Sequence, residues 1–527
     1  MSLDPITLQV MANALRAVAE EMGAALVRSA FSPNIKERRD CSTAIFDDAG
    51  RMVVQSASIP VHLGAMPEAV AAVRARGAAP GEVWLVNDPY RGGTHLPDLT
   101  MINAIALDGR TAAYAVTRAH HADVGGMAPG SMPAGSRELL QEGIVIPPVR
   151  IVRDGEPVED VIALLLANTR TPAEREGDLR AQLAAHRLAE RRLQEVAERH
   201  GPDRVRAAFT ALFDYAERRT RAAIAAMPDG RYEAAEALEG DGVTEGNLWI
   251  RVAVTIAGDS MTVDFAGTDP TGPGNCNCPP AVTRSAVYFV LRCLTDPDIP
   301  ASAGAFAPVT VLAPPGSLVD ARAPAAVAGG NVETSSRIVD AVFSALGQAV
   351  PVPAQGQGTM NNLTIGGAGF TYYETIGGGQ GASPDADGPS GVHVAMSNTL
   401  NTPVEALEVA YPLTVEAYRL RRGTGGPGAH RGGDGVERRV RVLVEADVSV
   451  IAERRARGPE GREGGGDGRP GRTTLNGRPL PAKWRGSLRP GDVIGIETPG
   501  GGGYGPPEEA IGEDGAHPAA PSENLSP

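Results

Sequence analysis

The chain has 527 residues, of which 42% are hydrophobic and 21% charged, and its formal net charge is −14. This composition is typical of a folded protein of two or more domains, and the acidic balance argues against a nucleic-acid-binding face, which needs clustered positive charge. Neither of its lysines, Lys36 and Lys483, lies in a G-x-x-x-x-G-K-[ST] motif, so the sequence excludes a phosphate-binding loop of that kind.

The cysteines, the N-terminal residues and the apolar runs indicate the compartment in which the protein is expected. Cys41, Cys276, Cys278 and Cys293 form no C-x-x-C pair, so we expect reduced thiols. The opening MSLDPITLQVM lacks the basic and apolar regions of a signal peptide. No apolar run approaches the ~20 residues that cross a bilayer. The sequence therefore predicts a cytoplasmic protein with no membrane contact.

The first 170 residues alternate between helical and strand patterns. Asp4 and Pro5 precede apolar residues spaced three and four apart, which predicts a capped helix that runs to about residue 30. A strand–turn–strand pattern at 42–56 predicts a hairpin around Asp-Asp-Ala-Gly. Further predicted elements are a helix at 67–77 and strands at 82–90, 99–107 and 111–126.

From residue 171 to 227 the pattern is helical. Two long Ala/Arg/Glu-rich amphipathic segments meet at Gly201-Pro202, which predicts an antiparallel helical hairpin. Strand patterns return at 248–258 and 260–268, and helical patterns occupy 283–294 and 335–350.

The C-terminal part is rich in glycine, asparagine and threonine. It predicts short strands within 437–455 and near 492–497, and the segment 457–472 is too rich in glycine and charge for packed regular structure, so we expect a long loop there.

These patterns together predict an α+β protein with mixed sheets, a helical hairpin insertion and a Gly-rich, mainly β C-terminal region. The predicted regions are an N-terminal α/β region with a His/Asp metal site at 1–170, the hairpin at 171–230, a mixed α/β region at 231–350, the Gly-rich β region at 351–506 and a disordered tail at 507–527.

Histidines and aspartates gather between residues 40 and 123. His62, His95, His120 and His121 lie there, and their near neighbours are Asp40, Asp88, Asp98 and Asp123. In His95-Leu-Pro-Asp98 the proline stiffens the backbone between two possible ligands. Adjacent histidines on a strand point in opposite directions, so only one of His120 and His121 can easily join His95.

A mixed set of imidazoles and carboxylates suits Zn²⁺, Mn²⁺ or Fe²⁺ better than Mg²⁺ or Ca²⁺. The alternative is a polar loop with hydrogen-bonded imidazoles and aspartate caps, because H-x-x-D is a weak motif and no H-E-x-x-H is present. Asp40 likewise could bind a metal or form a surface ion pair with Arg38 or Arg39, which contributes little stability. The spacing alone leaves these alternatives open.

Several blocks, in this order, resemble the hydantoinase B/oxoprolinase family: NDPYRGGTHLPDLT, RAHHADVGG, QEGIVIPPV, YYETIGGGQGA, MSNTLNTPVEALE and TGGPGAHRGGDG, with a closing TPGGGGYGPP. The resemblance runs from about residue 3 to 507. It departs from the family's pattern at 457–472, where the family has a more aromatic glycine block, and this leaves in doubt any partner contact made there.

The resemblance implies a metal site and a partner. Carried over by motif, the metal ligands would be Asp40, His95, Asp98 and His120, and the ion a divalent Zn, Mn or Fe. Members of the family usually work in a hetero-oligomer with a hydantoinase A-type ATPase subunit, which uses ATP to phosphorylate the substrate's oxygen.

The metal would lower the pKa of bound water and so supply hydroxide for attack. His121, Asp123 and Asp88 would then be candidates for the general base or for orienting a ligand. Arg118 would hold the substrate's phosphate or form a structural ion pair.

The leading functional hypothesis is the metal-dependent subunit of an ATP-coupled amidohydrolase that opens a small cyclic amide, such as a hydantoin, 5-oxoproline or another lactam. The first alternative is a subunit of an ATP-dependent ketone carboxylase of the acetone-carboxylase type. The second is a non-catalytic assembly subunit, which a complete set of four ligands disfavours.

Overall fold

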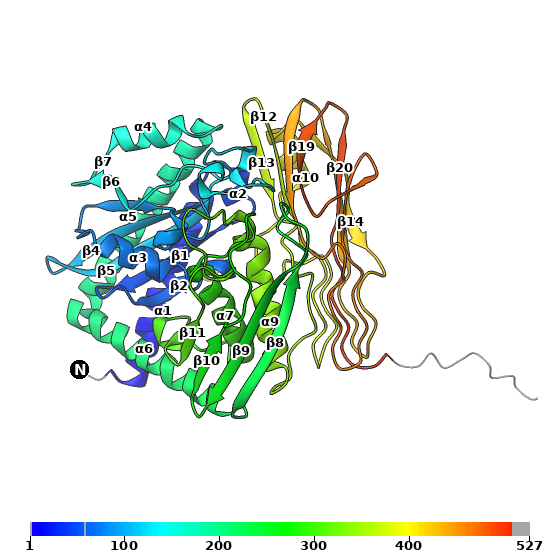
Figure 1. The fold of residues 1–527 in the computed structure, drawn as a ribbon. Coiled ribbons are helices and arrows are strands. Elements are labelled where there is room, and N and C mark those ends of the chain that lie inside the picture. Colours follow the sequence, from blue (N-terminus) through cyan, green and yellow to red (C-terminus); the bar gives the residue numbers. More distant parts are fainter. Residues whose placement is uncertain (1–2, 57–58, 508–527) are drawn as a thin grey trace, which may run out of the picture.

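The structure is a computed structural model that describes residues 3–56 and 59–507. Helices and strands arranged in several sheets confirm the predicted α+β class (Figure 1). The predicted disordered tail falls almost entirely on residues 508–527, outside the described residues. The division of the chain into five separate regions stays a prediction.

The largest sheet has seven strands in the order β2-β1-β5-β4-β3-β6-β7, and every neighbouring pair is antiparallel. The predicted hairpin at 42–56 and the predicted strand at 99–107 are confirmed as parts of it, and the strand predicted at 111–126 is present but ends at His120. The strands are β1 (Cys41–Asp47), β2 (Met52–Ser56), β3 (Val83–Val86), β4 (Asp98–Leu107), β5 (Arg110–His120), β6 (Val149–Arg153) and β7 (Glu156–Pro157).

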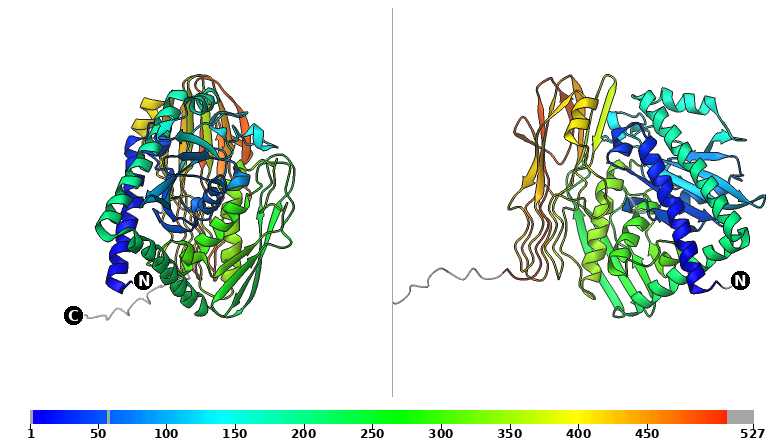
Figure 2. Two further views of the ribbon diagram at one scale, coloured as in Figure 1. Left: turned by 90° about the vertical axis from the view of Figure 1, so that its left-hand side faces the viewer. Right: turned by 180° about the vertical axis from the view of Figure 1, so that it is seen from behind.

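Helices cover both faces of this sheet. On one face, α1 (Pro5–Ser29) packs against β1 and β2, and α5 (Pro172–His200) lies along α1 and contacts β5 (Figure 2). Asp4 caps α1 by accepting hydrogen bonds from the backbone N–H groups of Ile6 and Thr7, as predicted. The remaining helices of this part are α2 (Pro33–Lys36), α3 (Met66–Arg74), α4 (Glu159–Ala167), α6 (Pro202–Ala225), and the short 3₁₀ helices η1 (Pro60–His62), η2 (Pro89–Arg91), η3 (Pro129–Ser131) and η4 (Leu139–Gln141).

The alternating side chains of β1 show which core each face of the sheet contacts. Cys41 and Ile45 belong to the core beneath α1 and α5, whereas Ala44 and Phe46 belong to the core that contains α3 and the second sheet. Because side chains alternate between faces, the even-numbered residues at this end of β1 look toward α3 and the second sheet.

The second sheet has four strands in the order β11-β10-β9-β8. A π-helical turn, η5 (Gly330–Thr334), leads directly into α9 (Ser335–Leu346), which packs on β8 and β9. The other elements are β8 (Gly230–Leu238), β9 (Leu248–Ala257), β10 (Ser260–Asp264), α7 (Pro280–Leu294), α8 (Ala303–Phe306) and β11 (Val309–Leu312).

The C-terminal third stacks two antiparallel sheets, in the orders β13-β12-β16-β19 and β14-β15-β20-β17-β18. Their inner faces share one core, which includes Leu363 and Val448 from the first sheet and Val440 and Ile494 from the second. The elements are β12 (Asn362–Gly367), β13 (Phe370–Glu374), α10 (Val404–Ala410), β14 (Leu413–Arg421), β15 (Gly435–Val442), β16 (Ala446–Ile451), β17 (Arg472–Leu475), β18 (Arg478–Leu480), β19 (Lys483–Leu488) and β20 (Val493–Glu497).

Below these sheets, irregular glycine-rich segments run side by side (Figures 1 and 2). We call residues 377–391, 424–435, 458–471 and 499–505 the glycine layer. Backbone hydrogen bonds join its segments, such as Gly501 N–H to Gly433 O at 2.9 Å and Gly466 N–H to Pro427 O at 2.7 Å. The segment predicted as a long loop at 457–472 lies mostly within this layer. It has no regular strand or helix before β17, yet it is packed against its neighbours.

Two further expectations concerned the cysteines and membrane-spanning helices. The four cysteines are free thiols. Among the residues that the structure describes, no helix is both long and apolar enough to cross a membrane.

Candidate metal centre

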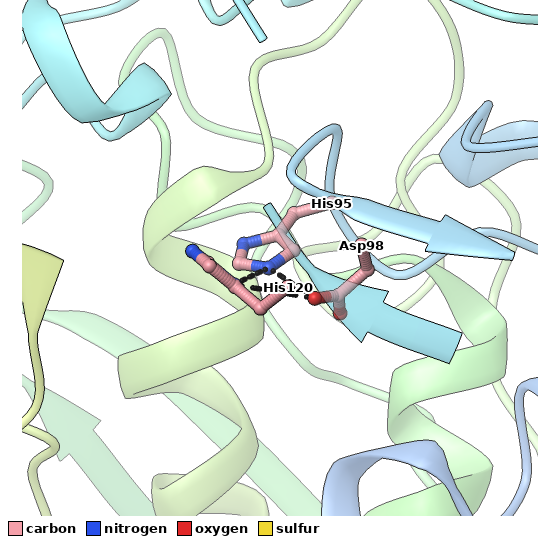
Figure 3. Close-up of side chains that lie close together, drawn as sticks. All are labelled: His95, Asp98 and His120. Carbon is pink, nitrogen blue, oxygen red and sulfur yellow. Dashed lines mark hydrogen bonds and ion pairs between the residues drawn. The ribbon is translucent and has the colours of Figure 1, made fainter. Parts of the chain in front are cut away.

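Three predicted ligands meet at one end of the seven-stranded sheet (Figure 3). His95 Nε2 lies 3.1 Å from Asp98 Oδ1 and 3.1 Å from His120 Nδ1, and His120 Nδ1 lies 3.2 Å from Asp98 Oδ1. All three side chains are at most 2% exposed. Two ring nitrogens and a carboxylate oxygen therefore form a buried, nearly equilateral triangle.

The sheet explains why these residues meet. Asp98 begins β4 and His120 ends β5, and the two are direct cross-strand partners. Partners in an antiparallel pair place their side chains on the same face, about 5 Å apart at Cβ. His95 follows from its position three residues before Asp98, across the stiff Leu-Pro pair.

Asp40 continues the same row just before a third strand. It precedes β1, and its backbone carbonyl accepts a hydrogen bond from His120 N–H at 3.0 Å. Asp40 lines the same cavity as the triangle, but its carboxylate is not among the atoms that converge on one point. The nearest cation is Arg38, whose Nη1 lies 3.8 Å from Asp40 Oδ2.

The second oxygen of Asp98 is held by other groups. His62 Nε2 lies 3.3 Å from Asp98 Oδ2, and the Thr94 hydroxyl donates a short hydrogen bond to the same oxygen. His62 Nδ1 is in turn 2.9 Å from the Ser42 hydroxyl. These contacts fix the carboxylate plane and leave Oδ1 directed at the two imidazoles, as partners of metal ligands usually do.

The electrostatics favour an ionised Asp98 beside a neutral His120. Burial by itself would raise the pKa of Asp98, but the charge of His95 and hydrogen bonds from His120, His62 and His95 hold that pKa well below its usual range. Burial lowers the pKa of His120, although Asp98 opposes the shift. An ionised carboxylate and a neutral imidazole are the forms that bind a metal ion.

The opposite wall of the cavity comes from elements far away in the sequence. The Tyr373 ring of β13 stacks on His120 with centroids 4.2 Å apart, and Asn331 and Val332 of η5 line the cavity with Met360. The free volume is about 20 Å³, room for an ion or one water molecule.

Hydroxyl groups backed by an arginine complete this wall. Thr375, Ser397 and Thr399 line the cavity, and Arg38 Nη2 donates to the Thr375 hydroxyl at 2.6 Å and the Thr399 hydroxyl at 3.2 Å. Arg38 also lies over the Tyr373 ring. The fully buried guanidinium thus connects Asp40, Tyr373 and the hydroxyl groups in one polar network.

His121 and Asp123, proposed from the sequence as bases, lie on the other side of the sheet or beyond its end. His121 Nε2 is 3.0 Å from Gln182 Oε1 of α5, as strand alternation predicts. Asp123 accepts hydrogen bonds from the Gly125 and Gly130 N–H groups and from Arg170. Neither residue lines the cavity of the triangle, and their catalytic roles stay predictions.

Asp88 and Arg118 also have structural partners. Asp88 caps η2 through a hydrogen bond from Tyr90 N–H at 2.9 Å. Arg118 donates from Nε to the Thr100 hydroxyl and from Nη2 to the Gly92 carbonyl, both at 2.7 Å. Burial lowers the pKa of this guanidinium to about 10. Neither residue lines the cavity of the triangle. The predicted roles of Asp88 as a base and of Arg118 as a substrate contact therefore stay predictions.

Three residues that line this cavity, His62, Tyr373 and Asn331, were not predicted as site residues. His62 carried a signal, since it is the first of four histidines within 62–121. Tyr373 and Asn331 carried none, because only the packing of η5 and β13 against the first sheet brings them to the site.

The triangle fits a divalent transition metal. A metal about 2.1 Å from each ligand in tetrahedral geometry separates the ligands by roughly 3.4 Å, close to the 3.1–3.2 Å edges found here. Two imidazole nitrogens with one carboxylate oxygen match Zn²⁺, Mn²⁺ or Fe²⁺. Asp40 is the nearest additional carboxylate in the cavity.

A larger cavity of about 440 Å³ lies between α7 and β11. Its lining includes Asp264, Arg284 and Asp320, but it contains no histidine or cysteine and is separate from the triangle. The small cavity therefore holds the candidate chemistry.

Comparison with known sequences gives a consistent picture. The hydantoinase B/oxoprolinase family profile matches residues 4–507. An uncharacterised protein of Methanocaldococcus jannaschii is 38% identical over 96% of this chain and 92% of its own length. The 5-oxoprolinase of Dictyostelium discoideum is 36% identical over 97% of this chain. This chain spans 41% of that protein's length. A protein of a Pseudomonas strain, provisionally named as a D-/L-hydantoinase subunit, is 32% identical, with 96% and 91% of the two chains covered.

Two solved structures share the fold. The ATP-dependent caprolactamase from Pseudomonas jessenii superposes with a TM-score of 0.89 at 31% identity, covering 96% of this chain and 92% of that one. A nucleotide-free acetone carboxylase gives a TM-score of 0.86 at 18% identity, covering 95% and 76%; at this identity the likeness concerns the fold alone. The profile match over nearly the whole chain and the full-length relatives show that this chain belongs to the hydantoinase B/oxoprolinase family.

Proposed function

We propose that this chain is the metal-dependent subunit of an ATP-coupled hydrolase that opens a small cyclic amide. The observation that carries the proposal is the buried triangle of His95, Asp98 and His120 in a chain of this family. The names of similar proteins supply the substrate class, since they include a 5-oxoprolinase, a hydantoinase subunit and a caprolactamase.

The ion would be a divalent Zn, Mn or Fe held by His95, Asp98 and His120, with Asp40 nearby. Such an ion supplies Lewis acidity toward water or an amide oxygen. His62 and Thr94 hold Asp98 in its orientation. Tyr373 limits access of water to one face of His120 by stacking on it.

ATP would act in a partner protein of the hydantoinase A type. The sequence lacks the lysine-containing phosphate loop, and a similar protein is named as one subunit of a hydantoinase, which implies at least one more. Phosphorylation of the ring carbonyl oxygen by the partner would make the carbon a better electrophile. The hydroxyl groups of Thr375 and Thr399, with Arg38 behind them, add polar groups to the wall of the cavity that would hold the ion.

A ketone carboxylase is a weaker candidate. Its support is the acetone carboxylase fold, which is shared at 18% identity and carries no argument about the reaction. No contact in the cavity distinguishes a ketone from a cyclic amide, so the preference for the hydrolase rests on the names of the more similar proteins.

The proposal is tested by producing the chain together with its ATPase partner. ADP release and ring opening are measured with hydantoin, 5-oxoproline and caprolactam as substrates, in parallel with elemental analysis of the purified chain. We expect ring opening of at least one substrate and about one transition-metal ion per chain. His95→Ala should lose both, while His200→Ala at the end of α5 is the matched control and should keep both.

Two results would contradict the proposal. Full ring-opening activity in a metal-free wild type would remove the metal role. ATP-dependent carboxylation of a ketone, without ring opening of any cyclic amide, would replace the hydrolase with the carboxylase.

A further inference from the structure

Three polar atoms of the residues around the small cavity have no partner in the protein. They are His95 Nδ1, His120 Nε2 and Asn331 Oδ1, and none of them has a hydrogen bond to any residue within 3–56 or 59–507. All three residues line the cavity and are at most 3% exposed. An unpaired buried polar atom costs free energy, so three of them around one cavity need an explanation.

The two ring nitrogens are donors in the form of the site that binds a metal ion. His95 Nε2 and His120 Nδ1 are corners of the triangle. Each must offer a lone pair to the ion, so the hydrogen of each neutral ring lies on the opposite nitrogen. Figure 3 shows these opposite nitrogens on the side of the triangle away from Asp98. A metal-bound histidine almost always donates this N–H to a carboxylate, a carbonyl or water.

Asn331 Oδ1 is the acceptor that matches these donors. A carboxamide oxygen accepts hydrogen bonds and donates none. Among the buried side-chain oxygens of the described residues that line this cavity, it is the one without a donor. Because no direct hydrogen bond joins it to either ring, a bridging group is needed. The ion would lie among the three triangle atoms, and the free volume of about 20 Å³ is enough for one water molecule.

The backbone around Asn331 is held firmly, so the position of its side chain is well defined. Asn331 begins the second residue of the π-helical turn η5, and its N–H donates to Val327 O at 3.1 Å. The preceding N–H, of Gly330, donates to Asn275 O at 2.9 Å. The Ser335 hydroxyl donates to Asn331 O at 2.6 Å. Single π-helical turns of this kind are frequent at functional sites.

We propose that Asn331 is a positioning residue for the metal ligands, and that its Oδ1 accepts the hydrogens of His95 Nδ1 and His120 Nε2 through one bound water. A water molecule accepts two hydrogen bonds and donates two, so it satisfies all three atoms and keeps one hydrogen for the hydroxyl groups of the wall. This bridge fixes each imidazole in the tautomer whose free nitrogen faces the ion. The inference rests on the metal site of the proposed function.

Metal affinity separates this role from a purely structural one. The affinity of the purified chain for Zn²⁺ is measured by competition with a chelator. Asn331→Leu removes the acceptor while the triangle remains, so the affinity should fall about 10–100-fold. Asn331→Asp keeps an acceptor at the same place, so its affinity should equal or exceed that of the wild type. A carboxamide needed only for packing would give the same loss in both variants.

Asn275→Leu is the matched control. Asn275 is fully buried and its Oδ1 likewise has no partner in the described part of the chain, but the residue does not line the cavity. The same substitution there should leave the affinity for Zn²⁺ unchanged. Circular dichroism spectra show whether each variant is folded.

A crystal structure of the zinc-loaded wild type tests the water directly. An ordered water should lie within about 3.2 Å of Asn331 Oδ1 and of both ring nitrogens. The same water should be absent from the zinc-loaded Asn331→Leu variant.

The outcomes distinguish this inference from the proposed function. A wild-type chain that binds no divalent metal would overturn the metal role and this inference together. A wild type that binds Zn²⁺, with full affinity in Asn331→Leu or equal losses in Asn331→Leu and Asn331→Asp, would overturn the inference alone. Direct coordination of the ion by Asn331 Oδ1 in the crystal would also overturn it, because the atom would then be a ligand.

Discussion

The seven-stranded sheet and the glycine layer organise the chain in opposite ways. In the sheet, strands at ordinary spacing present side chains, and two of these, from Asp98 and His120, meet His95 in the triangle. In the glycine layer, backbones approach so closely that a Cβ at Gly501 would lie 2.0 Å from Gln380 O, and one at Gly432 would lie 2.0 Å from Gly501 O. The site in the sheet depends on the identity of its side chains. The packing of the glycine layer depends on the absence of side chains at its glycines.

This difference predicts two kinds of sensitivity to mutation. Removing a ligand side chain from the sheet should abolish metal binding while the fold remains. Adding a single methyl group to the glycine layer should disrupt the fold itself, because backbone atoms on both sides cannot move away cheaply.

The largest effect is expected in the glycine layer. Gly501→Ala places a methyl group against the Gln380 backbone, and we expect a loss of more than about 4 kcal/mol in unfolding free energy or no folded protein. Denaturant unfolding measures it. Gly135→Ala is the matched control, since a Cβ there meets nothing within 4 Å, and a similar loss in that control would contradict the comparison.

The next largest effect is expected at the triangle. Asp98→Ala removes the oxygen that both imidazoles approach, so the purified chain should contain little metal and turnover with the partner should fall more than about 100-fold, beyond the range for residues that only orient ligands. The circular dichroism spectrum should match that of the wild type. Wild-type metal content in this variant would show that the ion lies elsewhere.

A smaller effect is expected at His62, which holds the other oxygen of Asp98. His62→Phe should weaken metal affinity by about 10–100-fold without abolishing binding, because all three triangle residues remain. Competition with a chelator measures the affinity. An affinity equal to that of the wild type would mean that Thr94 alone orients the carboxylate.

The smallest effect concerns a histidine away from the site. His186, 3.0 Å from the Thr117 hydroxyl, has its pKa lowered to about 3 by burial, whereas an unfolded histidine titrates near 6.5. The unfolded chain therefore binds the extra proton as pH falls below 6.5, and the folded chain loses stability.

At pH 5 this loss amounts to about 2 kcal/mol for one histidine. His186→Gln should accordingly lose less stability than the wild type between pH 7 and pH 5 in denaturant unfolding. Parallel pH dependences for the two proteins would contradict the assignment.

Much of the fold was predictable because local signals were strong. The capped helix after Asp4, the hairpin at 42–56 and the two long helices that meet at Gly201 all appear where their patterns predict. The glycine layer was the exception. Its segments were expected to be strands or a loop. Hydrophobic periodicity in the sequence predicts helices and strands, but it does not predict that irregular backbones will pack against one another.

The site was predictable in part for a related reason. Asp98 and His120 are cross-strand partners in a hairpin with a two-residue Asp108-Gly109 turn, so sequence distance is a fair guide to their contact. The contacts of Tyr373 and Asn331 depend on packing between the sheets, and only the folded chain reveals them. His121 and Asp123 were selected by proximity in sequence, but strand alternation and Arg170 direct them elsewhere.

The three triangle residues all belong to one hairpin and the turn that leads into it, with His95 and His120 only 25 positions apart. Closing so short a loop costs little entropy, and hairpins form within microseconds. An ion would thus find its complete first set of ligands long before the C-terminal third of the chain reaches the site. The metal would then bind a hairpin that has already formed, and the later arrival of η5 and β13 would bury it.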